Sequence, residues 1–565
     1  MSLTQGYFHR KLTALTLSIL SLGALDIKKV YAAENILFVY TPFIANLRVN
    51  SLEQFAKDGT INQNLGFYLN LARVNQEQTA EFRRALTTPV IVDPVLISRI
   101  LNTDEGERLL NYFGSVINIR GGRNGKHILR GALVKASMEK DGLTLINVLR
   151  NLSVDVQVNI SQVLRYSNQI NLVFKGSELF NSEIVNLATI ETKSSAPVDF
   201  NQLTDIRKPG TLPIKNSTLN LFDSQRNRKF YVELYQPQQL TPNNPVIVLS
   251  HGLSSRPEDF AKIASHLASY GYVVAMPQHP GSDLRQTQDF IAGFSRQIFL
   301  LNEFIDRPKD VTFLLDELTR LNGSQFGGNL NLNSVGVAGH SFGGYTALAV
   351  AGAKIDFEHL ENSCNLAIGN LNNSLLLQCR ALQLPRKDYD FRDPRVKAAF
   401  TFNPVNASLF GVNGLNEVEI PTFFGAGSYD PATPFIFEQV RTFPFLKSQN
   451  TYFQLQEGQA HVDFSQLDAG ITDLVETVGN LTLPSPYLLD EYTNSMALAF
   501  FKVHLSNDEN YRVYLQSAYG KHLSEGQEFK THIITHKSVP LLREKVEQFI
   551  RDNQDLIFGI RVSKN

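Results

Sequence analysis

The chain has 565 residues, contains no tryptophan and has only four methionines, two cysteines and 19% charged residues. Its formal net charge of −1 provides no basic surplus, which argues against nucleic acid as a partner and against electrostatic attachment to anionic lipid. The two cysteines have no further cysteine or histidine at ligand spacing, so we expect no metal site.

Beyond its N-terminus the sequence also lacks an apolar run long enough to span a membrane. The N-terminus has basic residues, then an apolar stretch from residue 12 to 25, then Ala32 and Ala33, a pattern typical of a secretory signal peptide over residues 1–33. An uncleaved anchor is the alternative, because charged residues at 26–29 lengthen the cleavage region. We therefore expect an exported protein, periplasmic or secreted, with no stable transmembrane anchoring after cleavage.

The two cysteines, Cys364 and Cys379, lie close together in one loop-rich stretch. In an exported chain we expect them to form a disulfide, which for a loop of this size would stabilise the fold by about 3 kcal/mol. Two unrelated buried thiols are the alternative.

The length of the chain exceeds what one compact core usually holds, so we predict two domains. Residues 34–192 have a helical pattern without evident chemistry and predict an all-α domain of unknown role. Residues 193–210 are polar and predict a linker. Residues 211–555 alternate strand and helix patterns, which predicts an α/β domain with a doubly wound, mostly parallel sheet.

The motif Gly339-His340-Ser341-Phe342-Gly343 lies between an apolar strand pattern and a helix pattern. Such a strand, sharp turn and helix form a nucleophile elbow, in which the two glycines leave room for a strained turn that exposes the serine hydroxyl. Ser341 is therefore the predicted nucleophile.

A serine hydroxyl needs a general base and an acid that orients the base, and in this architecture they follow in the order Ser, acid, His. Asp430 follows an apolar strand pattern and is the predicted acid, with Asp463 and Asp283 as rivals. His461 follows the last apolar strand pattern and is the predicted base. Four later histidines are not predicted as the base, because we expect them in or after a closing helical region, away from a strand end: His504, His522, His532 and His536.

Acyl transfer also needs donors for the developing oxyanion. The loop that begins at His251 follows a predicted strand, and Gly252 allows close approach, so the backbone N–H of Leu253 is one predicted donor. The N–H of Phe342, the residue after the nucleophile, is the other. His251 is predicted to support this loop.

Four segments together carry a family resemblance: His251-Gly252-Leu253 and residues 265–274, 307–311 and 339–344. They resemble the platelet-activating-factor acetylhydrolase and dienelactone hydrolase-like branch of α/β hydrolases, over roughly residues 212 to 553. The N-terminal half resembles the domain that precedes this hydrolase in a family of exported bacterial proteins.

The resemblance implies a serine esterase without a cofactor, with the triad and oxyanion donors predicted above. This chain departs from the acetylhydrolases in one place. In those enzymes the catalytic acid follows an earlier strand, but the comparable strand of this chain ends at Asn403 without a carboxylate. Asp430, after the next strand, fits the dienelactone hydrolase arrangement. Those enzymes often have a cysteine where this chain has Ser341, and serine favours ester hydrolysis.

Residues 355–394 form a predicted insertion that contains both cysteines and several leucines. It is either a disulfide-tied lid that shapes an acyl pocket or a surface segment that holds two helices together.

The sequence as a whole predicts a serine hydrolase that cleaves small-molecule or lipid carboxylic esters. One alternative is a lipid deacylase of the phospholipase A2 or platelet-activating-factor acetylhydrolase type, and another is a peptidase on the same triad. A third is a non-catalytic binding or scaffold protein with a vestigial hydrolase fold, against which the intact set of serine, acid and histidine argues. The oligomeric state is left open.

Overall fold

The computed structural model describes residues 33–40, 42–366, 371–461 and 483–558. The chain divides into two compact units, the first formed by residues up to 97 with 113–160 and the second by residues 98–112 with 161 onward. The predicted signal peptide, residues 1–33, lies outside the described residues except for Ala33. None of the helices in the described part of the chain is long and apolar enough to cross a membrane.

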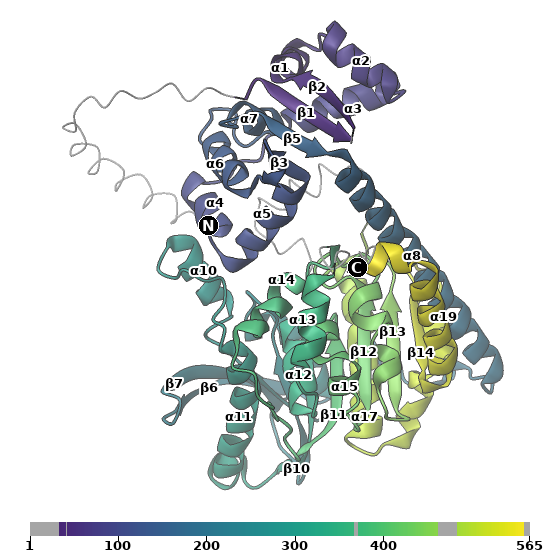
Figure 1. The fold of residues 1–565 in the computed structure, drawn as a ribbon. Helices are drawn as coiled ribbons and strands as arrows, with labels where there is room; N and C mark the ends of the chain where they lie inside the picture. Colours follow the sequence, from purple (N-terminus) through teal and green to yellow (C-terminus); the bar gives the residue numbers. More distant parts are fainter. Residues whose placement is uncertain (1–32, 41, 367–370, 462–482, 559–565) are drawn as a thin grey trace. The chain divides into compact units, whose positions relative to one another are not determined.

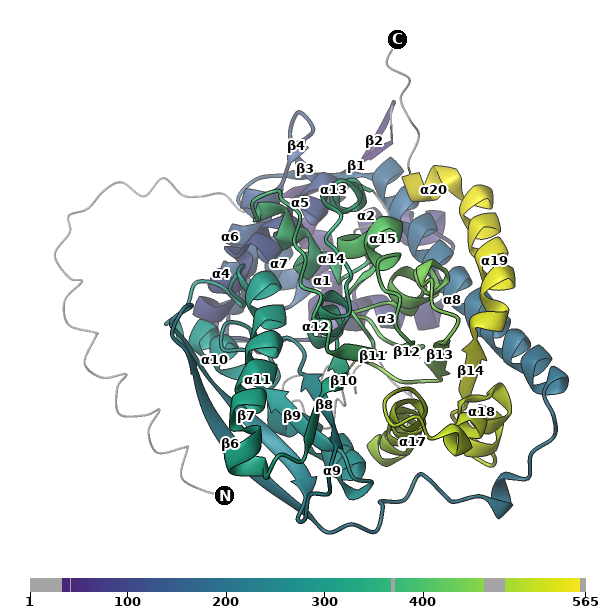
Figure 2. The same ribbon diagram turned by 90° about the horizontal axis from the view of Figure 1, so that it is seen from below.

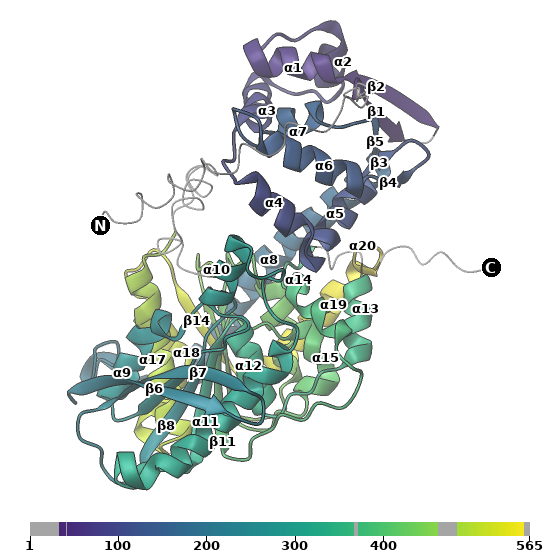
Figure 3. The same ribbon diagram turned by 90° about the vertical axis from the view of Figure 1, so that its left-hand side faces the viewer.

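The first unit contains a small five-stranded sheet in the order β2-β1-β5-β3-β4, with helices around it (Figures 1 and 3). Its strands are β1 (Asn35–Tyr40), β2 (Phe43–Arg48), β3 (Ile117–Ile119), β4 (Arg123–Asn124) and β5 (Val156–Asn159). Its helices are α1 (Val49–Asp58), α2 (Gln63–Leu71), α3 (Gln76–Thr87), α6 (Lys126–Ser137) and α7 (Leu145–Arg150), while the residues of α4 (Pro94–Leu101) and α5 (Asp104–Val116) are divided between the units.

This sheet corrects the prediction of an all-α N-terminal domain to a helical domain with a small sheet. The strands are short, and β1 pairs in parallel with β5 from the far end of the unit. β3, β4 and β5 have three, two and four residues, too few to show an alternating pattern, so only the tertiary pairing reveals them. β1 and β2 have six residues each, but buried and exposed positions do not alternate along them.

The second unit is built on a nine-stranded sheet in the order β14-β13-β12-β11-β10-β8-β9-β7-β6. The six strands from β13 to β9 are parallel, and antiparallel pairs occur only at the two edges. The predicted mostly parallel sheet is therefore confirmed. Its strands are β6 (Ile214–Asp223), β7 (Arg228–Pro237), β8 (Asn244–Ser250), β9 (Val273–Pro277), β10 (Leu330–His340), β11 (Val396–Phe402), β12 (Thr422–Gly427), β13 (Thr451–Gln456) and β14 (Thr531–Thr535).

Helices cover both faces of this sheet (Figure 2). One layer contains α9 (Ala261–Ser269), α17 (Pro486–His504) and α18 (Ser517–Leu523), and the other contains α8 (Ile160–Ser194), α11 (Glu303–Phe326), α12 (Phe342–Val350), α15 (Ala407–Leu415) and α19 (Val539–Asp552). In β8, Val246 and Val248 pack into one layer while Ile247 and Leu249 pack into the other. Because both faces are buried, the central strands are continuous apolar runs. The remaining α-helices of the described residues are α10 (Leu284–Ala292), α13 (Phe357–Asn365), α14 (Leu375–Gln378) and α20 (Gln554–Phe558).

Helix α8 belongs to the second unit, which moves the boundary away from the predicted division at residues 192 and 193. Phe180 of α8 packs edge to face on Phe549 of α19, with 5.5 Å between ring centroids. Near the end of α8, the Glu191 carboxylate accepts hydrogen bonds from the hydroxyls of Ser517, Thr535 and Ser538. The helical pattern of α8 gives no sign of these partners, because they come from the far end of the chain.

The edge strand β14 corrects the placement of two histidines. His532 lies within β14 and His536 directly follows it, so neither belongs to a helical region away from a strand end. The His532 ring forms a 2.9 Å hydrogen bond with the Glu457 carboxylate. The five-residue strand is defined by its antiparallel pairing with β13, which the sequence pattern does not reveal.

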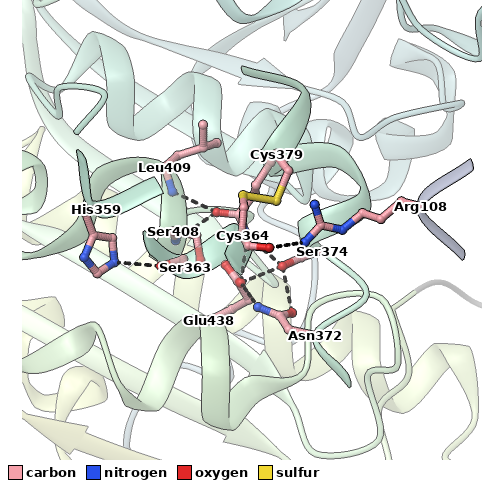
Figure 4. Close-up of a disulfide and its surroundings, with 11 residues drawn as sticks. Arg108, His359, Ser363, Cys364, Asn372, Ser374, Cys379, Ser408, Leu409 and Glu438 are labelled. Carbon is pink, nitrogen blue, oxygen red and sulfur yellow. Dashed lines mark hydrogen bonds between the residues drawn. A yellow bond between two sulfur atoms is a disulfide. The ribbon is translucent and has the colours of Figure 1, made fainter. Parts of the chain in front are cut away.

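The predicted disulfide between Cys364 and Cys379 is present, and it ties α13 to the segment after α14 (Figure 4). The buried Glu438 carboxylate accepts hydrogen bonds from three side chains of the insertion, those of Asn372, Ser374 and Gln378. The Gln378 amide oxygen in turn accepts from two backbone N–H groups at the start of α15. The described part of the insertion is therefore hydrogen-bonded firmly to its surroundings.

Candidate active site

Ser341 lies at the turn between β10 and α12. Its backbone has φ 57° and ψ −118°, a sparsely populated positive-φ conformation that costs a non-glycine residue about 1–3 kcal/mol. The two glycines of the motif are required by close packing, because a Cβ on Gly339 would lie 2.0 Å from the Gly343 carbonyl oxygen, and one on Gly343 would lie 1.9 Å from that of Ser250. The turn therefore has the geometry of the predicted nucleophile elbow.

The structure brings together the three residues predicted as nucleophile, base and acid. His461 Nε2 lies 2.8 Å from Ser341 Oγ, and His461 Nδ1 lies 2.7 Å from Asp430 Oδ2. Ser341 directly follows β10, Asp430 follows β12, and His461 follows β13, so all three lie beyond the carboxyl ends of parallel strands. Asp430 accepts only, so the Nδ1 atom of His461 carries the proton and Nε2 is free to accept the serine proton.

Asp430 is buried and its carboxylate is fully engaged. Burial alone would raise the pKa of Asp430, but the neighbouring His461 and hydrogen bonds from Thr433 hold it below its ordinary value. Asp430 Oδ1 accepts from the backbone N–H groups of Ala432 and Thr433, and Oδ2 accepts from the Thr433 hydroxyl at 2.7 Å. The carboxylate therefore stays ionised and fixed beside the imidazole.

Two contributors near His461 were not predicted from sequence. The His340 Nε2 atom donates to the His461 carbonyl oxygen at 2.8 Å, and the two rings lie 4.7 Å apart. Burial, with His461 nearby, lowers the pKa of His340 to about 3, so this ring is neutral. Thr433 is the second, because its hydroxyl also lies 3.3 Å from His461 Nδ1. The only sequence signal for His340 was its place beside the nucleophile, and Thr433 had none.

The predicted oxyanion donors lie beside the nucleophile. Phe342 is the first residue of α12, where a backbone N–H has no acceptor within the helix. Leu253 follows Gly252, and a Cβ on Gly252 would lie 3.3 Å from the Ser341 Cβ, so the loop lies close beside the serine. The loop and the helix start can therefore both present donors at one side of Ser341.

The rival assignments have other roles or lie outside the described residues. Asp283 caps α10 by accepting from the Gln286 N–H, and Asp463 lies outside the described residues. His251 is fully buried behind the loop, and burial together with Arg307 lowers its pKa well below the ordinary value. Within the described ranges, no group of three or more His, Cys, Asp and Glu side chains is arranged to hold a metal ion.

The sheet, the elbow and the site at its carboxyl edge define an α/β hydrolase. Comparison with family models agrees: residues 32–159 match a family described as an alpha/beta hydrolase of unknown function, and residues 202–372 match the chlorophyllase family. No curated protein matches the sequence. The chain belongs to the α/β-hydrolase superfamily.

Proposed function

We propose that this protein is an exported serine hydrolase that cleaves carboxylic esters through an acyl-enzyme on Ser341. The observation that carries the proposal is the continuous hydrogen-bonded series from Asp430 through His461 to the Ser341 hydroxyl, with distances of 2.7 and 2.8 Å. A serine hydroxyl becomes nucleophilic at neutral pH when it lies at a strained elbow and is hydrogen-bonded to a histidine that can take its proton.

In the acylation step, Ser341 Oγ attacks the ester carbonyl carbon while His461 Nε2 takes the serine proton. The carbonyl oxygen becomes an oxyanion, which the N–H groups of Leu253 and Phe342 stabilise. When the tetrahedral intermediate collapses, His461 gives its proton to the departing alkoxide, and the acyl group remains on Ser341. Asp430 stabilises the imidazolium that forms between these two transfers.

In the deacylation step, His461 removes a proton from water, and the hydroxide attacks the acyl carbon. The second tetrahedral intermediate releases the carboxylic acid as His461 returns the proton to Ser341 Oγ. Every proton is thus accounted for by one imidazole, and the cycle needs no cofactor.

The test is hydrolysis of p-nitrophenyl esters from acetate to palmitate by the purified mature protein and by Ser341→Ala. We expect turnover by the wild type and loss of nearly all of it in the variant. A chain-length optimum at long acyl groups would favour a lipid deacylase over a short-acyl esterase. If neither protein hydrolyses any ester and a fluorophosphonate probe leaves Ser341 unlabelled, the enzymatic proposal fails and a binding role replaces it.

Export is part of the same proposal. The disulfide between Cys364 and Cys379 supports it, because disulfides persist in oxidising compartments outside the cytosol. The mass of the protein recovered from an expressing bacterium tests it: we expect the N-terminal 33 residues to be missing and the protein to fractionate outside the cytosol. Recovery of the full-length chain in the cytosol would contradict it.

A further inference from the structure

Arg307 of α11 is fully buried beneath the loop that carries the proposed oxyanion donor. Its Nη1 atom donates to the His251 carbonyl oxygen at 2.6 Å, and its Nη2 atom donates to the Gly252 carbonyl oxygen at 3.2 Å. The proposed proton transfers do not use this arginine. Burying a guanidinium has a large desolvation cost, which the interactions that this arginine makes in return must offset.

The geometry of the peptide unit shows what one of these interactions does. The Gly252 carbonyl and the Leu253 N–H belong to the same planar trans peptide, so they point in opposite directions. A donor that holds the carbonyl on the buried side therefore directs the N–H toward the other side. Ser341 lies close to this peptide, since an added Cβ on Gly252 would lie 3.3 Å from the serine Cβ.

His251 holds the same carbonyl oxygen. Its Nε2 atom accepts from the His279 backbone N–H at 3.1 Å, so its Nδ1 atom carries the ring proton and donates to the Gly252 oxygen at 2.7 Å. The Gly252 carbonyl thus receives two donors from the interior, and rotation of the Gly252–Leu253 peptide would break both.

The guanidinium is itself fixed on its remaining sides. Its Nε atom donates to Ser282 Oγ at 2.8 Å, and Ser282 donates to Glu303 at 2.7 Å. The guanidinium carbon lies 4.4 Å from the centre of the Phe342 ring, the side chain of the second proposed donor residue. Arg307 is therefore in contact with both halves of the proposed oxyanion hole.

We propose that Arg307 is a positioning residue that, with His251, aims the Leu253 N–H at the oxyanion. This inference rests on the proposed hydrolysis at Ser341. It predicts that the arginine acts on the transition state and has little influence on binding of the ester itself.

The test compares Arg307→Lys with Arg228→Lys. A lysine at 307 keeps the charge but cannot hold two carbonyls with a planar fork. Arg228 is the matched control, since it lies in the same buried cluster and shares Glu303 with Arg307, but its described ion pairs go to carboxylates rather than to the loop carbonyls. For Arg307→Lys we expect kcat to fall by about 10- to 100-fold with KM nearly unchanged, because the donor is misdirected but still present. The affinity for a trifluoromethyl ketone inhibitor, whose adduct mimics the oxyanion, should fall by a similar factor.

Arg228→Lys should lose stability but keep kcat per folded molecule. An equal loss of kcat in the two variants would overturn the inference, because it would indicate general disruption of the charged cluster. Unchanged kcat in Arg307→Lys would also overturn it. If Arg307→Lys does not fold, Ser282→Ala removes the Nε contact, together with the hydrogen bond from Ser282 to Glu303, and leaves both contacts to the loop carbonyls in place. It should lower kcat in the same direction by a smaller factor, and no change would count against the inference.

A crystal structure of Arg307→Lys separates this inference from the proposed function. We expect the Gly252–Leu253 peptide to rotate or to adopt two orientations, and an unmoved peptide would overturn the positioning role whatever the ester assays give. Activity that survives Ser341→Ala would instead refute the proposed function. The positioning role of Arg307 would then be judged from the orientation of the Gly252–Leu253 peptide alone.

Discussion

The Asp430 carboxylate determines which nitrogen of His461 carries the proton. An asparagine there would offer an N–H to His461 Nδ1 and favour the tautomer with the proton on Nε2, which cannot accept from Ser341. We predict that Asp430→Asn lowers kcat by about 10⁴-fold while the chain stays folded. Steady-state kinetics on a p-nitrophenyl ester measures this. Asp283→Asn, which alters the cap of α10 and a hydrogen bond from the Gln278 side chain, is the control and should keep kcat; a comparable loss there would contradict the assignment of the acid.

The buried ring of His340 predicts a dependence of stability on pH. Its pKa is lowered from 6.5 to about 3 by burial and by His461, so the unfolded chain binds a proton that the folded chain does not between these two values. Stability rises with pH where the unfolded state binds more protons, so the free energy of unfolding should fall as pH drops from about 6.5 toward 3. Thermal unfolding of wild type and His340→Gln at several pH values tests this, since glutamine can donate to the His461 carbonyl without titrating. Parallel curves for the two proteins would contradict it.

At the scale of elements, the sequence predicted those parts whose signal is local. The elbow, the strands of the parallel sheet and the order of Ser341, Asp430 and His461 follow from apolar runs and from turns at strand ends. The five-stranded sheet, β14 and the partners of α8 were missed, because they depend on pairing between distant segments. For the same reason His340, Thr433 and Arg307 were not assigned roles: their importance lies in which carbonyl or carboxylate they face, which only the fold determines.

The disulfide-tied insertion is the element whose role is open to a direct test. Replacing both cysteines with serine should lower the free energy of unfolding by about 3 kcal/mol, the chain-entropy value for a loop of this size. Activity per folded molecule should stay unchanged, because Glu438 still accepts hydrogen bonds from Asn372, Ser374 and Gln378. Denaturant unfolding and ester kinetics measure the two effects. A changed acyl-length preference in this variant would instead favour a mobile lid.

At the scale of the whole molecule, the placement of α8 predicts where the chain can be shortened. A variant that begins at residue 195, close to the boundary suggested by sequence, loses Phe180, Ile184 and Leu187, which are buried in the core of the second unit. Each such side chain contributes about 1.5–3 kcal/mol, so their sum approaches the whole stability of a typical domain. It also leaves Ser517, Thr535 and Ser538 without the Glu191 carboxylate that accepts from them. We predict that this variant is insoluble or unfolds below 37 °C.

A variant that begins at Ser161 retains α8 and these contacts, and it should fold and hydrolyse p-nitrophenyl esters with the kcat of the mature protein. It does lack residues 98–112, which belong to the second unit and whose Glu105 pairs with Arg380 at 2.7 Å. Arg380→Gln in the full chain removes the ion pairs with Asp104 and Glu105 and should reproduce part of any fall in melting temperature of the Ser161 variant, which also loses the hydrogen bond from Arg108 to the Cys364 carbonyl oxygen. The melting temperatures of the three variants, measured by circular dichroism, test this prediction. Equal stability of the variants that begin at 161 and 195 would contradict it, because it would show that the buried face of α8 contributes little to the core of the second unit.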